Sequence, residues 1–508
     1  METERGEVSM ERNRWMYAEP ESVGIRSEWI LDFLHRMEAE GAELHGIVII
    51  KDHRVILEAY ASPYSREIPH IMHSFTKCLT NTAVGLAYSR GLLRLEDPIL
   101  HYFPEYESHA NAFLKKLTIR DLLDMRSGQV RPIGGNEWRP LETSWIDAYF
   151  QVEWDKAPGS KFMYSSGNSY ILSAIVQKVS GMSCDLYLKE NMTNQMGCGD
   201  FTWMKSPEGI CSGGNGAMLC VEDMAAIGQV YLDRGLWNGK RLLCEEWVDL
   251  ALGKKKPTPR EKGEPEYNFH WRHSEKGIWV SRGMFGQVCC LIPELNMTAA
   301  FTAADKKYAG DRLFQECIVY PALAVEKKAE ADAVNDGGKV ARILRLYASR
   351  MTLEGKPEHA IRPKPFQRRY RAEAPVDTIT EAAIEVTDQE LLFSIRDERG
   401  IHTVRHGLNT WKHGVTSMTG RYLHHQYEFA SMKISAQASW MDKDHLLLEW
   451  RYPEMAFFDT VQIAFSGDGR ICMKRQVNMN SEDTERPQMW FFQLDAKESS
   501  GVGNGIEW

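Results

Sequence analysis

A serine and a lysine that could act together stand three residues apart, in the run Ser74-Phe75-Thr76-Lys77. Side chains at this spacing lie on one face of a helix. At the first turn of a helix, a serine oxygen meets free backbone N–H groups and the positive end of the helix dipole. A desolvated lysine beside it can lose its proton near neutral pH. The pair therefore predicts a nucleophile with its base in the same turn.

The residues after Lys77 separate this interpretation from an ordinary helix start. In the alternative, Ser74 only caps the helix and Lys77 lies in solvent. Residues 78–87, however, are small and apolar on nearly every face, which is typical of a buried helix. A lysine that opens a buried helix needs a partner or a chemical role. The context therefore favours the nucleophile.

A polar loop later in the chain supplies a third side chain. Tyr164 lies in the stretch 158–169, which leads into a helical pattern. A tyrosine next to an ammonium group has a lowered pKa and can exchange protons with a serine. The alternative is a core tyrosine whose hydroxyl is satisfied. Ser166 and Asn168 are expected to hold Lys77 or a substrate carbonyl, and turn formation with helix capping is the alternative, favoured for Asn168.

A third segment, 281–287, is a strand that ends in two glycines, Gly283 and Gly286. Glycine lets the backbone approach a ligand closely. A strand that runs past Ser74 would offer a backbone N–H to an acyl oxygen. Together with the N–H of Ser74, that group would form an oxyanion hole. A plain β-turn is the alternative, and spacing alone favours it.

The elements that must bring these segments together follow from the apolar patterns. Residues 20–45 carry a helical period, and 45–50 and 55–60 are predicted to be two strands of a hairpin. Helical patterns dominate from 74 to about 250. Strand patterns then return at 277–282, 288–292 and 297–302. This order predicts an α+β fold with one antiparallel sheet built from both ends of the region.

A charge-rich stretch, 326–371, separates this region from the rest of the chain. It contains a helical piece at 340–347 and a proline-containing run at 362–365, and we interpret it as a linker. Short β patterns alternate after it, which predicts an all-β barrel or sandwich. The predicted organisation is a catalytic domain over 1–325, the linker, and a C-terminal antiparallel β domain over 372–508.

The composition of the 508 residues is that of a globular protein, with 43% hydrophobic and 26% charged residues. A net charge of −9 without a long basic run argues against a nucleic-acid partner. Neither a signal peptide nor a membrane-spanning helix is expected. The ten cysteines are scattered, which indicates reduced thiols and a cytoplasmic location. Metal-ligand spacings are absent, so no metal or other cofactor is expected.

The three segments also occur in the order of a known family. Ser-x-x-Lys opening an apolar helix, a Tyr-containing loop and a Gly-bearing strand resemble the penicillin-binding, serine β-lactamase-like hydrolases. The resemblance covers residues 18–322 and points to the class C β-lactamase and family VIII esterase-like branch. The connecting segments that carry it are GLLRLEDPILHYFPEY, LTIRDLLDMRSG, PGSKFMYSSGNSYILSAIVQKVSGMS, YLDRGLWNGKRLL and GMFGQVCCLIPELNMTAAFT. The C-terminal part is similar to the lipocalin-like barrels appended to some members.

This resemblance implies a β-lactamase/transpeptidase-like domain, with an antiparallel sheet flanked by helices, and a role for each site residue. Ser74 would be the acylated nucleophile, Lys77 its activator and Tyr164 the proton shuttle to the leaving group. The backbone N–H groups of Ser74 and Met284 would form the oxyanion hole. Substrate contacts would come from Ser166, Asn168, Ser281 and Gly283.

Two positions depart from the family pattern. Ser166 stands where the β-lactamases and peptidases usually have asparagine. The third motif reads Ser281-Arg282-Gly283 in place of Lys-Thr-Gly or His-x-Gly, and Arg282 points to the other face of a regular strand. The position that commonly meets the substrate carboxylate is therefore uncharged. This argues against efficient β-lactam hydrolysis and favours the esterase, amidase or aminohydrolase branch.

The sequence thus predicts a serine hydrolase that cleaves a small ester, amide or short peptide through an acyl-enzyme on Ser74. Two alternatives stay open: a peptidase or amidase acting on D-amino-acid-containing peptides, and a non-catalytic penicillin-binding-like sensor. Pocket-lining residues are expected from the loop 131–138 and from Ser144 and Trp145. No nucleic-acid or membrane partner is expected, and a homo-oligomer is left open.

Overall fold

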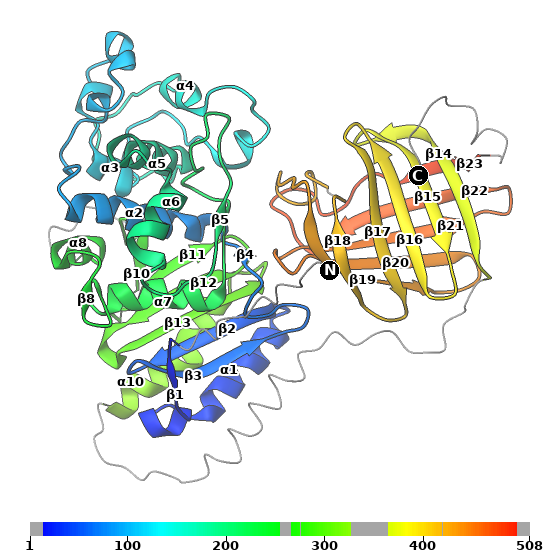
Figure 1. Cartoon of the computed structure of the whole chain (residues 1–508), viewed down its shortest axis with the longest axis horizontal. Helices are drawn as coiled ribbons and strands as arrows, with labels where there is room; N and C mark the ends of the chain where they lie inside the picture. Colours follow the sequence, from blue (N-terminus) through cyan, green and yellow to red (C-terminus); the bar gives the residue numbers. More distant parts are fainter. Residues whose placement is uncertain (1–13, 254–265, 275, 327–363, 419, 495–508) are drawn as a thin grey trace, which may run out of the picture. The chain divides into compact units, whose positions relative to one another are not determined.

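A computed structural model describes residues 14–253, 266–274, 276–326, 364–418 and 420–494. These residues belong to two compact units (Figure 1). Unit 1 holds most of the chain up to Glu326, and it contains every residue of the predicted site. Unit 2 holds the C-terminal strands together with two short earlier segments, Ala61–Ile71 and Asn136–Pro140.

Unit 1 is built on an eight-stranded sheet in the order β1-β3-β2-β13-β12-β11-β10-β9. Its neighbouring strands are antiparallel except for β1 and β3, and β2 pairs directly with β13. The prediction of one sheet assembled from both ends of the region is therefore confirmed. The strands are β1 (Met16–Tyr17), β2 (Glu43–Lys51), β3 (Arg54–Tyr60), β9 (Tyr267–Asn268), β10 (Trp271–His273), β11 (Trp279–Gly283), β12 (Gln287–Ile292) and β13 (Met297–Ala304).

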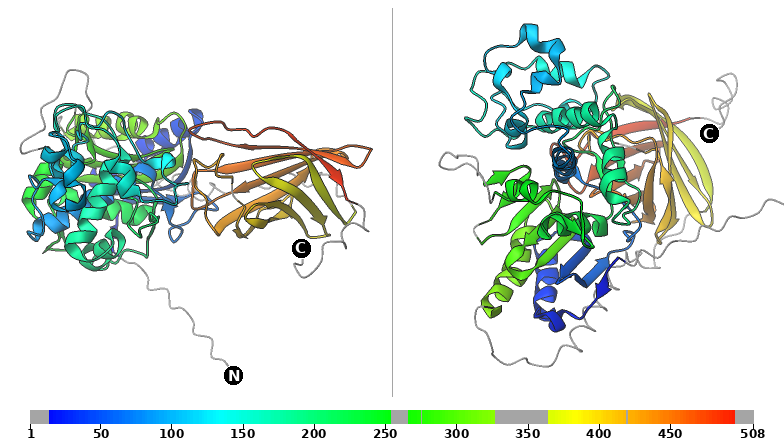
Figure 2. Two further views of the ribbon diagram at one scale, coloured as in Figure 1. Left: turned by 90° about the horizontal axis from the view of Figure 1, so that it is seen from above. Right: turned by 60° about the vertical axis from the view of Figure 1, so that its left-hand side comes forward.

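Helices cover both faces of this sheet (Figures 1 and 2). On one face, Phe33 of α1 packs against Phe301 of β13, with 5.8 Å between ring centres. On the other face, the hydroxyl of Thr298 donates to Gln229 of α7 at 3.0 Å. Because both faces are covered, β2 is apolar and buried along nearly its whole length.

The helices of unit 1 begin and end where local signals act. The expected helix over 20–45 is shorter, α1 (Ser27–Ala39), because Gly41 takes a left-handed φ of 75° just after it. Thr118 and Asp121 form a capping box at the start of α3. The remaining helices are α2 (Thr76–Ser89), α3 (Ile119–Leu123), α4 (Trp145–Phe150), α5 (Ser166–Ser180), α6 (Cys184–Leu188), α7 (Val221–Leu232), α8 (Glu245–Ala251), α9 (Gly310–Phe314) and α10 (Tyr320–Glu326).

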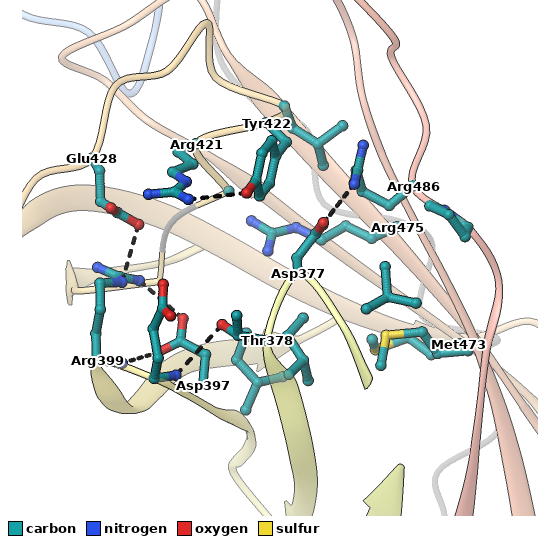
Figure 3. A pocket seen from close by; sticks show the side chains of 18 residues that line it. Asp377, Thr378, Asp397, Arg399, Arg421, Tyr422, Glu428, Met473, Arg475 and Arg486 are labelled. Atoms are coloured by element: carbon teal, nitrogen blue, oxygen red, sulfur yellow. Dashed lines mark hydrogen bonds and ion pairs between the residues drawn. The ribbon is translucent and has the colours of Figure 1, made fainter. Parts of the chain in front are cut away.

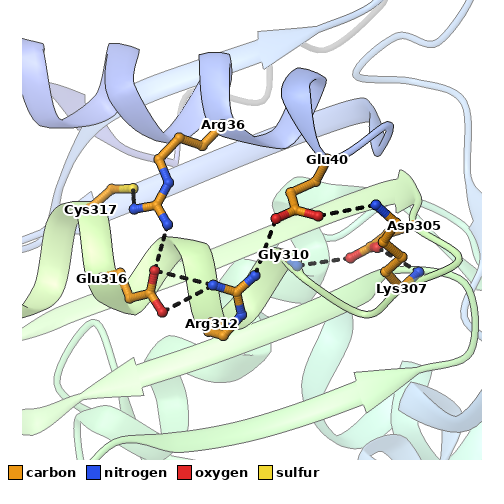
Figure 4. Close-up of polar contacts among 8 residues, drawn as sticks. All are labelled: Arg36, Glu40, Asp305, Lys307, Gly310, Arg312, Glu316 and Cys317. Atoms are coloured by element: carbon orange, nitrogen blue, oxygen red, sulfur yellow. Dashed lines mark hydrogen bonds and ion pairs between the residues drawn. The ribbon is translucent and has the colours of Figure 1, made fainter.

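A surface network of ion pairs ties α1 to the segment after β13 (Figure 4). Arg36 pairs with Glu316 at 2.7 Å, and Arg312 pairs with Glu316 at 3.0 Å and with Glu40 at 3.7 Å. These side chains are partly exposed, and such pairs are each worth about 0–1 kcal/mol. The network therefore adds little stability beyond the aromatic core beneath it.

Unit 2 is a closed β-barrel. Its strands follow the order β17-β16-β15-β14-β23-β22-β21-β20-β19-β18, and an additional pairing of β17 with β19 closes a ring of nine strands. Of the two predicted architectures, barrel or sandwich, the barrel is confirmed. The strands are β14 (Phe366–Val376), β15 (Ile379–Val386), β16 (Glu390–Asp397), β17 (Gly400–Leu408), β18 (Lys412–Thr416), β19 (Met432–Trp440), β20 (His445–Arg451), β21 (Phe458–Phe465), β22 (Arg470–Val477) and β23 (Met489–Gln493).

Two features of unit 2 differ from the predicted division of the chain. β14 begins at Phe366, inside the expected linker 326–371, whose helical piece at 340–347 lies outside the described residues. Two early segments also belong to unit 2. The backbone N–H of Ile71 donates to the carbonyl of Glu454 at 2.8 Å, and the guanidinium of Arg139 stacks on the ring of Tyr427. Sequence patterns do not reveal such contacts, because they join residues that are distant in the chain.

A pocket in the barrel is lined by charges of both signs (Figure 3). Arg486 holds Asp377 at 2.6 Å, and Arg399 contacts Asp397 at 3.3 Å and Glu428 at 3.0 Å. Each of these carboxylates therefore faces a guanidinium, and the pocket walls are largely neutralised from within the barrel.

Candidate active site

Ser74 lies in a short 3-10 turn, η2 (His73–Phe75), between β4 (His70–Ile71) and α2. The preceding residue, His73, has a φ of 40°, an uncommon conformation for a non-glycine residue. Strained backbone of this kind is found where the surrounding structure holds a functional residue in place. His73 and Phe75 are buried, whereas Ser74 is half-buried. The turn therefore presents the Ser74 hydroxyl and buries its neighbours.

Lys77 is buried, with 2% of its surface exposed, as the apolar pattern after it predicts. Its Nζ donates to Ser74 Oγ at 3.3 Å, to Ser166 Oγ at 3.1 Å and to the carbonyl of Gly214 at 2.6 Å. It also lies 4.7 Å from the centre of the Tyr164 ring. The amine is thus within proton-transfer distance of the serine, the requirement for a base that activates a nucleophile.

Tyr164 completes the cluster, and its environment shifts its acidity. Its ring lies against the amine of Lys77, which in turn contacts Ser74. Burial opposes ionisation of the phenol. The charge of Lys77, the polar surroundings that Ser74 and Lys77 provide and the charge of Arg272 outweigh burial and lower the pKa of Tyr164 below its ordinary value. Tyr164 is therefore able to exchange a proton with Ser74 more readily than an ordinary tyrosine.

A glycine-rich loop that sequence reasoning missed anchors Lys77. The carbonyl of Gly214 accepts from Lys77, and the carbonyl of Gly213 accepts from Thr80 one turn along α2 at 2.6 Å. A Cβ atom on Gly214 would lie 2.8 Å from the Cβ of Ser166, and one on Gly213 would collide with the Ser169 carbonyl. Only glycine fits this closely. The sequence feature that could have revealed this loop is the glycine-rich run Ser212-Gly213-Gly214-Asn215-Gly216.

The third predicted segment lies beside the nucleophile. β11 packs next to η2, and a Cβ on Gly283 would collide with the carbonyl of Met72, two residues before Ser74. Gly283 therefore allows β11 to approach this turn. Met284 begins the turn after β11. That its N–H and the N–H of Ser74 form an oxyanion hole stays a prediction.

The two side chains of the third motif, those of Ser281 and Arg282, lie against other parts of unit 1. Ser281 is buried, with 2% of its surface exposed. Arg282 is paired with Asp311 of α9. Ser281 and Gly283 therefore serve packing in this structure, and their proposed contact with substrate stays a prediction.

Asn168 has a partner inside the protein, and its role in substrate binding stays a prediction. Asn168 is fully buried in α5, and its carbonyl oxygen accepts from the hydroxyl of Tyr149 at 3.1 Å. Ser166, two residues earlier at the start of α5, does contact Lys77. The helix period explains the difference, because residues two positions apart do not share a face.

The two segments expected to line a pocket have different surroundings. Glycine at 134 lets its loop lie against the start of α5, where Gly167 donates to the carbonyl of Ile133 at 2.8 Å. Trp145 is instead buried against Tyr170, with 5.5 Å between ring centres. The ring of Trp145 therefore packs in the core, and the lining of a pocket by the region of Ser144 and Trp145 stays a prediction.

A short hairpin of β9 and β10 adds three side chains that sequence reasoning did not single out. The ring of Tyr267 lies edge-on to Tyr164 at 6.1 Å, and its hydroxyl hydrogen-bonds with Nδ1 of His270 at 2.8 Å. Burial and the nearby Lys77 charge hold the pKa of His270 well below its ordinary value. Arg272 lies 6.0 Å from the Tyr164 ring. No motif marks these residues, since only the fold brings them to the site.

An antiparallel sheet flanked by helices, with Ser-x-x-Lys at the start of a buried helix and a tyrosine against the lysine, defines the β-lactamase/transpeptidase-like class. The sequence profile of the beta-lactamase family matches residues 34–316, more than half of the chain. The chain therefore belongs to the beta-lactamase family. Among the helices of the described residues, none is both long enough and apolar enough to cross a membrane.

Comparison with individual proteins agrees with this family. A 6-aminohexanoate-dimer hydrolase from Paenarthrobacter ureafaciens is 23% identical over 272 residues, 48% of this chain and 69% of that protein. Proteins from Salmonella agona and other strains, whose names refer to D-alanyl-D-alanine carboxypeptidase, are 22% identical over 213 residues, and the match covers 35% of this chain and 48% of their length. A solved Bacteroides dorei protein named after beta-lactamase matches with a TM-score of 0.50 and 14% identity over 58% of this chain and 98% of that chain, a similarity of fold alone.

Proposed function

We propose that this protein is a serine hydrolase that cleaves an ester or an amide through an acyl-enzyme on Ser74. The observation that carries the proposal is the position of the buried Lys77 amine, 3.3 Å from Ser74 Oγ and against the ring of Tyr164. A buried amine among hydroxyl groups has a proton to exchange, and the residue that carries the proposed nucleophile, Ser74, is half-buried rather than fully buried.

The proposed reaction has two halves. Ser74 Oγ attacks the substrate carbonyl, and its proton passes to Lys77 or Tyr164. The tetrahedral oxyanion is held by the N–H groups of Ser74 and Met284. Tyr164 then protonates the leaving alcohol or amine as the carbonyl re-forms. A water molecule, deprotonated by the same pair, attacks the acyl-enzyme and releases the acid.

The choice of ester and amide substrates is supported by two observations. The third motif places no free charge where β-lactam and peptide carboxylates are commonly held, since Arg282 is paired with Asp311. The relative from Paenarthrobacter ureafaciens is named for the hydrolysis of a 6-aminohexanoate dimer. A second candidate, a peptidase on D-amino-acid-containing peptides, is favoured by the names of the Salmonella relatives.

Two further predictions belong to this proposal. All ten cysteines are free thiols in the structure, which supports a reducing, cytoplasmic location. Assembly into a homo-oligomer stays open and is measured directly by light scattering of the purified chain.

The proposal is tested by comparing Ser74→Ala with the wild-type protein on short-chain nitrophenyl esters, linear amides and D-amino-acid dipeptides. Wild-type protein should hydrolyse esters or amides, and Ser74→Ala should lose activity by at least about 10³-fold with an unchanged melting temperature. Ser108→Ala, at an exposed serine, is the matched control. Preference for the dipeptides selects the second candidate. Wild-type activity retained by Ser74→Ala contradicts both, and a stable acyl adduct without turnover identifies a sensor.

A further inference from the structure

The site contains a charge that no motif accounts for. A phenolate at Tyr164 is stabilised by positive charge, and in the related hydrolases a charged third-motif residue stands on the strand next to the nucleophile. Here that strand, β11, offers the buried Ser281, and its Arg282 is paired with Asp311. A second positive charge beside Tyr164 must therefore come from another element.

Arg272 lies on β10, the strand next to β11. Its guanidinium carbon is 6.0 Å from the centre of the Tyr164 ring and 5.7 Å from the centre of the Tyr267 ring. In the sheet register Arg272 is opposite Val280, the neighbour of Ser281 in β11. Among the residues that the structure describes, no carboxylate lies within ion-pair distance of Arg272. Its charge faces the rings of Tyr164 and Tyr267.

The hairpin that carries Arg272 is fixed to the same helix as Lys77. Phe269 and His270 form a two-residue turn in which both φ angles are positive, 43° and 72°, as in a type I′ hairpin. The amide of Asn81 in α2 donates to the carbonyl of Phe269 at 2.5 Å. The side chain of Arg272 is therefore held by a rigid element rather than by a surface loop.

We propose that Arg272 is a positioning residue that supplies the second positive charge beside Tyr164, in place of a charged third-motif residue, and so keeps the Tyr164 phenol usable as a base at neutral pH. This inference rests on the proposed hydrolase function. It assigns an electrostatic role to a residue of β10 that lies in none of the three sequence motifs.

The other titratable groups around Tyr164 do not supply this charge. His270 is kept neutral by burial and by Lys77, which lower its pKa. Burial, and then the charge of Tyr164 itself, raise the pKa of Tyr267, so that tyrosine keeps its proton. The negative charge of Asp124 also raises the pKa of Tyr267, whereas a cation would lower it. Lys77 and Arg272 are the two cations whose charge favours ionisation of Tyr164.

The test compares the pH dependence of two Arg272 variants on a neutral substrate, so that substrate charge plays no part. Arg272→Gln should move the acid limb of kcat/KM for a neutral nitrophenyl ester to higher pH by about 1 unit, the lower end of the effect of a nearby charge. Below that limb the rate should fall about tenfold, and above it the rate should recover. Arg272→Lys should restore the wild-type profile. Lys276→Gln, at an exposed lysine on the following turn, is the matched control.

A second measurement does not require turnover. The ultraviolet absorbance of tyrosinate is titrated in wild-type protein and in Tyr164→Phe, and the difference between them is assigned to Tyr164. The Arg272→Gln variant, with its own Tyr164→Phe reference, should show this difference at higher pH. An unchanged profile and an unchanged titration, in a variant with wild-type melting temperature, would overturn the role of Arg272. A raised KM for anionic esters alone would likewise overturn it, in favour of substrate binding.

The failure of this inference is distinct from failure of the proposed function. If wild-type protein hydrolyses the ester and Ser74→Ala does not, the function stands whatever the Arg272 variants do. If the wild-type protein shows no reaction at Ser74, the function fails, and the inference about Arg272 fails with it.

Discussion

Each unit of this protein contains a buried cation, and the two have different kinds of partner. Lys77 in unit 1 and Arg475 in unit 2 have 2% and 7% of their surface exposed. The described contacts of Lys77 are to two hydroxyls, a backbone carbonyl and a tyrosine ring. Arg475 instead donates to the carboxylate of Asp459 at 3.0 and 2.6 Å, and His424 contacts the other oxygen at 2.6 Å.

The difference lies in what each cation can exchange. Burial raises the cost of ionising Asp459, but His424 and Arg475 outweigh it and lower the pKa of that carboxyl. The barrel cluster is therefore a fixed pair of charges at neutral pH, which supports structure and moves no proton. The described partners of Lys77 include the hydroxyls of Ser74 and Ser166, which can themselves gain or lose a proton. A buried charge with a carboxylate partner is structural, and one held by hydroxyls is available for chemistry.

The largest expected effect is the loss of activity when Lys77, the buried cation of unit 1, is replaced. Lys77→Met should reduce kcat/KM for an ester by about 10³- to 10⁴-fold, about 4–5.5 kcal/mol of transition-state free energy, because the amine that activates Ser74 is lost. Thermal unfolding should confirm that the variant is folded. A Lys77→Met protein with more than a tenth of wild-type activity would show that the amine does not activate Ser74.

The converse change should affect stability and leave catalysis intact. Arg475→Met leaves Asp459 buried with only His424, and we expect a loss of about 3–5 kcal/mol in the free energy of unfolding of the barrel. Urea denaturation measures it, and kcat/KM at 25 °C should stay within about twofold of wild type where the protein is folded. The double variant Asp459→Leu/Arg475→Met should recover most of the loss. A single variant as stable as wild type would show that the ion pair is not structural.

The acid dependence of the barrel follows from the same pair. The pKa of Asp459 is lower in the folded protein than in the unfolded chain, so its contribution to stability is present above the unfolded pKa, about 4. That contribution is lost as pH falls through the lower, folded pKa. Urea midpoints between pH 7 and pH 3 should therefore decline more steeply in wild type than in the double variant. Equal slopes would contradict the assignment.

Tyr164 should have the next effect on activity. Tyr164→Phe removes the hydroxyl that exchanges protons with Ser74 and should lower kcat by about 10²- to 10³-fold, with little change in KM. Tyr267→Phe keeps the ring that packs against Tyr164 and is the matched control, with an expected change below about tenfold. Equal losses in the two variants would mean that the phenol of Tyr164 has no special role.

The smallest expected effect concerns the loop that anchors Lys77. Gly214→Ala adds a methyl group 2.8 Å from the Cβ of Ser166 and should displace the carbonyl that binds Lys77. A displacement of this kind should lower kcat/KM by about tenfold to 100-fold. Gly414→Ala in the barrel, where the added methyl meets no atom within 4 Å, is the control. If the Gly214→Ala variant is as active as the Gly414→Ala control, the contact between the Gly214 carbonyl and Lys77 is dispensable.

Local patterns were sufficient to predict much of the fold and the central part of the site. The apolar periods gave the two hairpin strands and the buried helix after Lys77, because these signals depend on neighbours in the chain. The departures share a different cause. Asn168 binds Tyr149, Trp145 fills the core, and Arg272 reaches Tyr164 only through a sheet whose strands come from both ends of unit 1. Contacts of that kind depend on packing between distant segments, which one sequence does not encode locally.

The account depends on one reactive hydroxyl, and covalent labelling tests it most directly. The wild-type protein, Lys77→Met and Arg475→Met are incubated with a neutral fluorophosphonate, and the modified residue is identified by intact mass and peptide mapping. The account predicts one adduct at Ser74 in wild type and in Arg475→Met, and labelling that is slower by at least about 10²-fold in Lys77→Met. An adduct on another residue, or equal labelling rates in all three proteins, would contradict it.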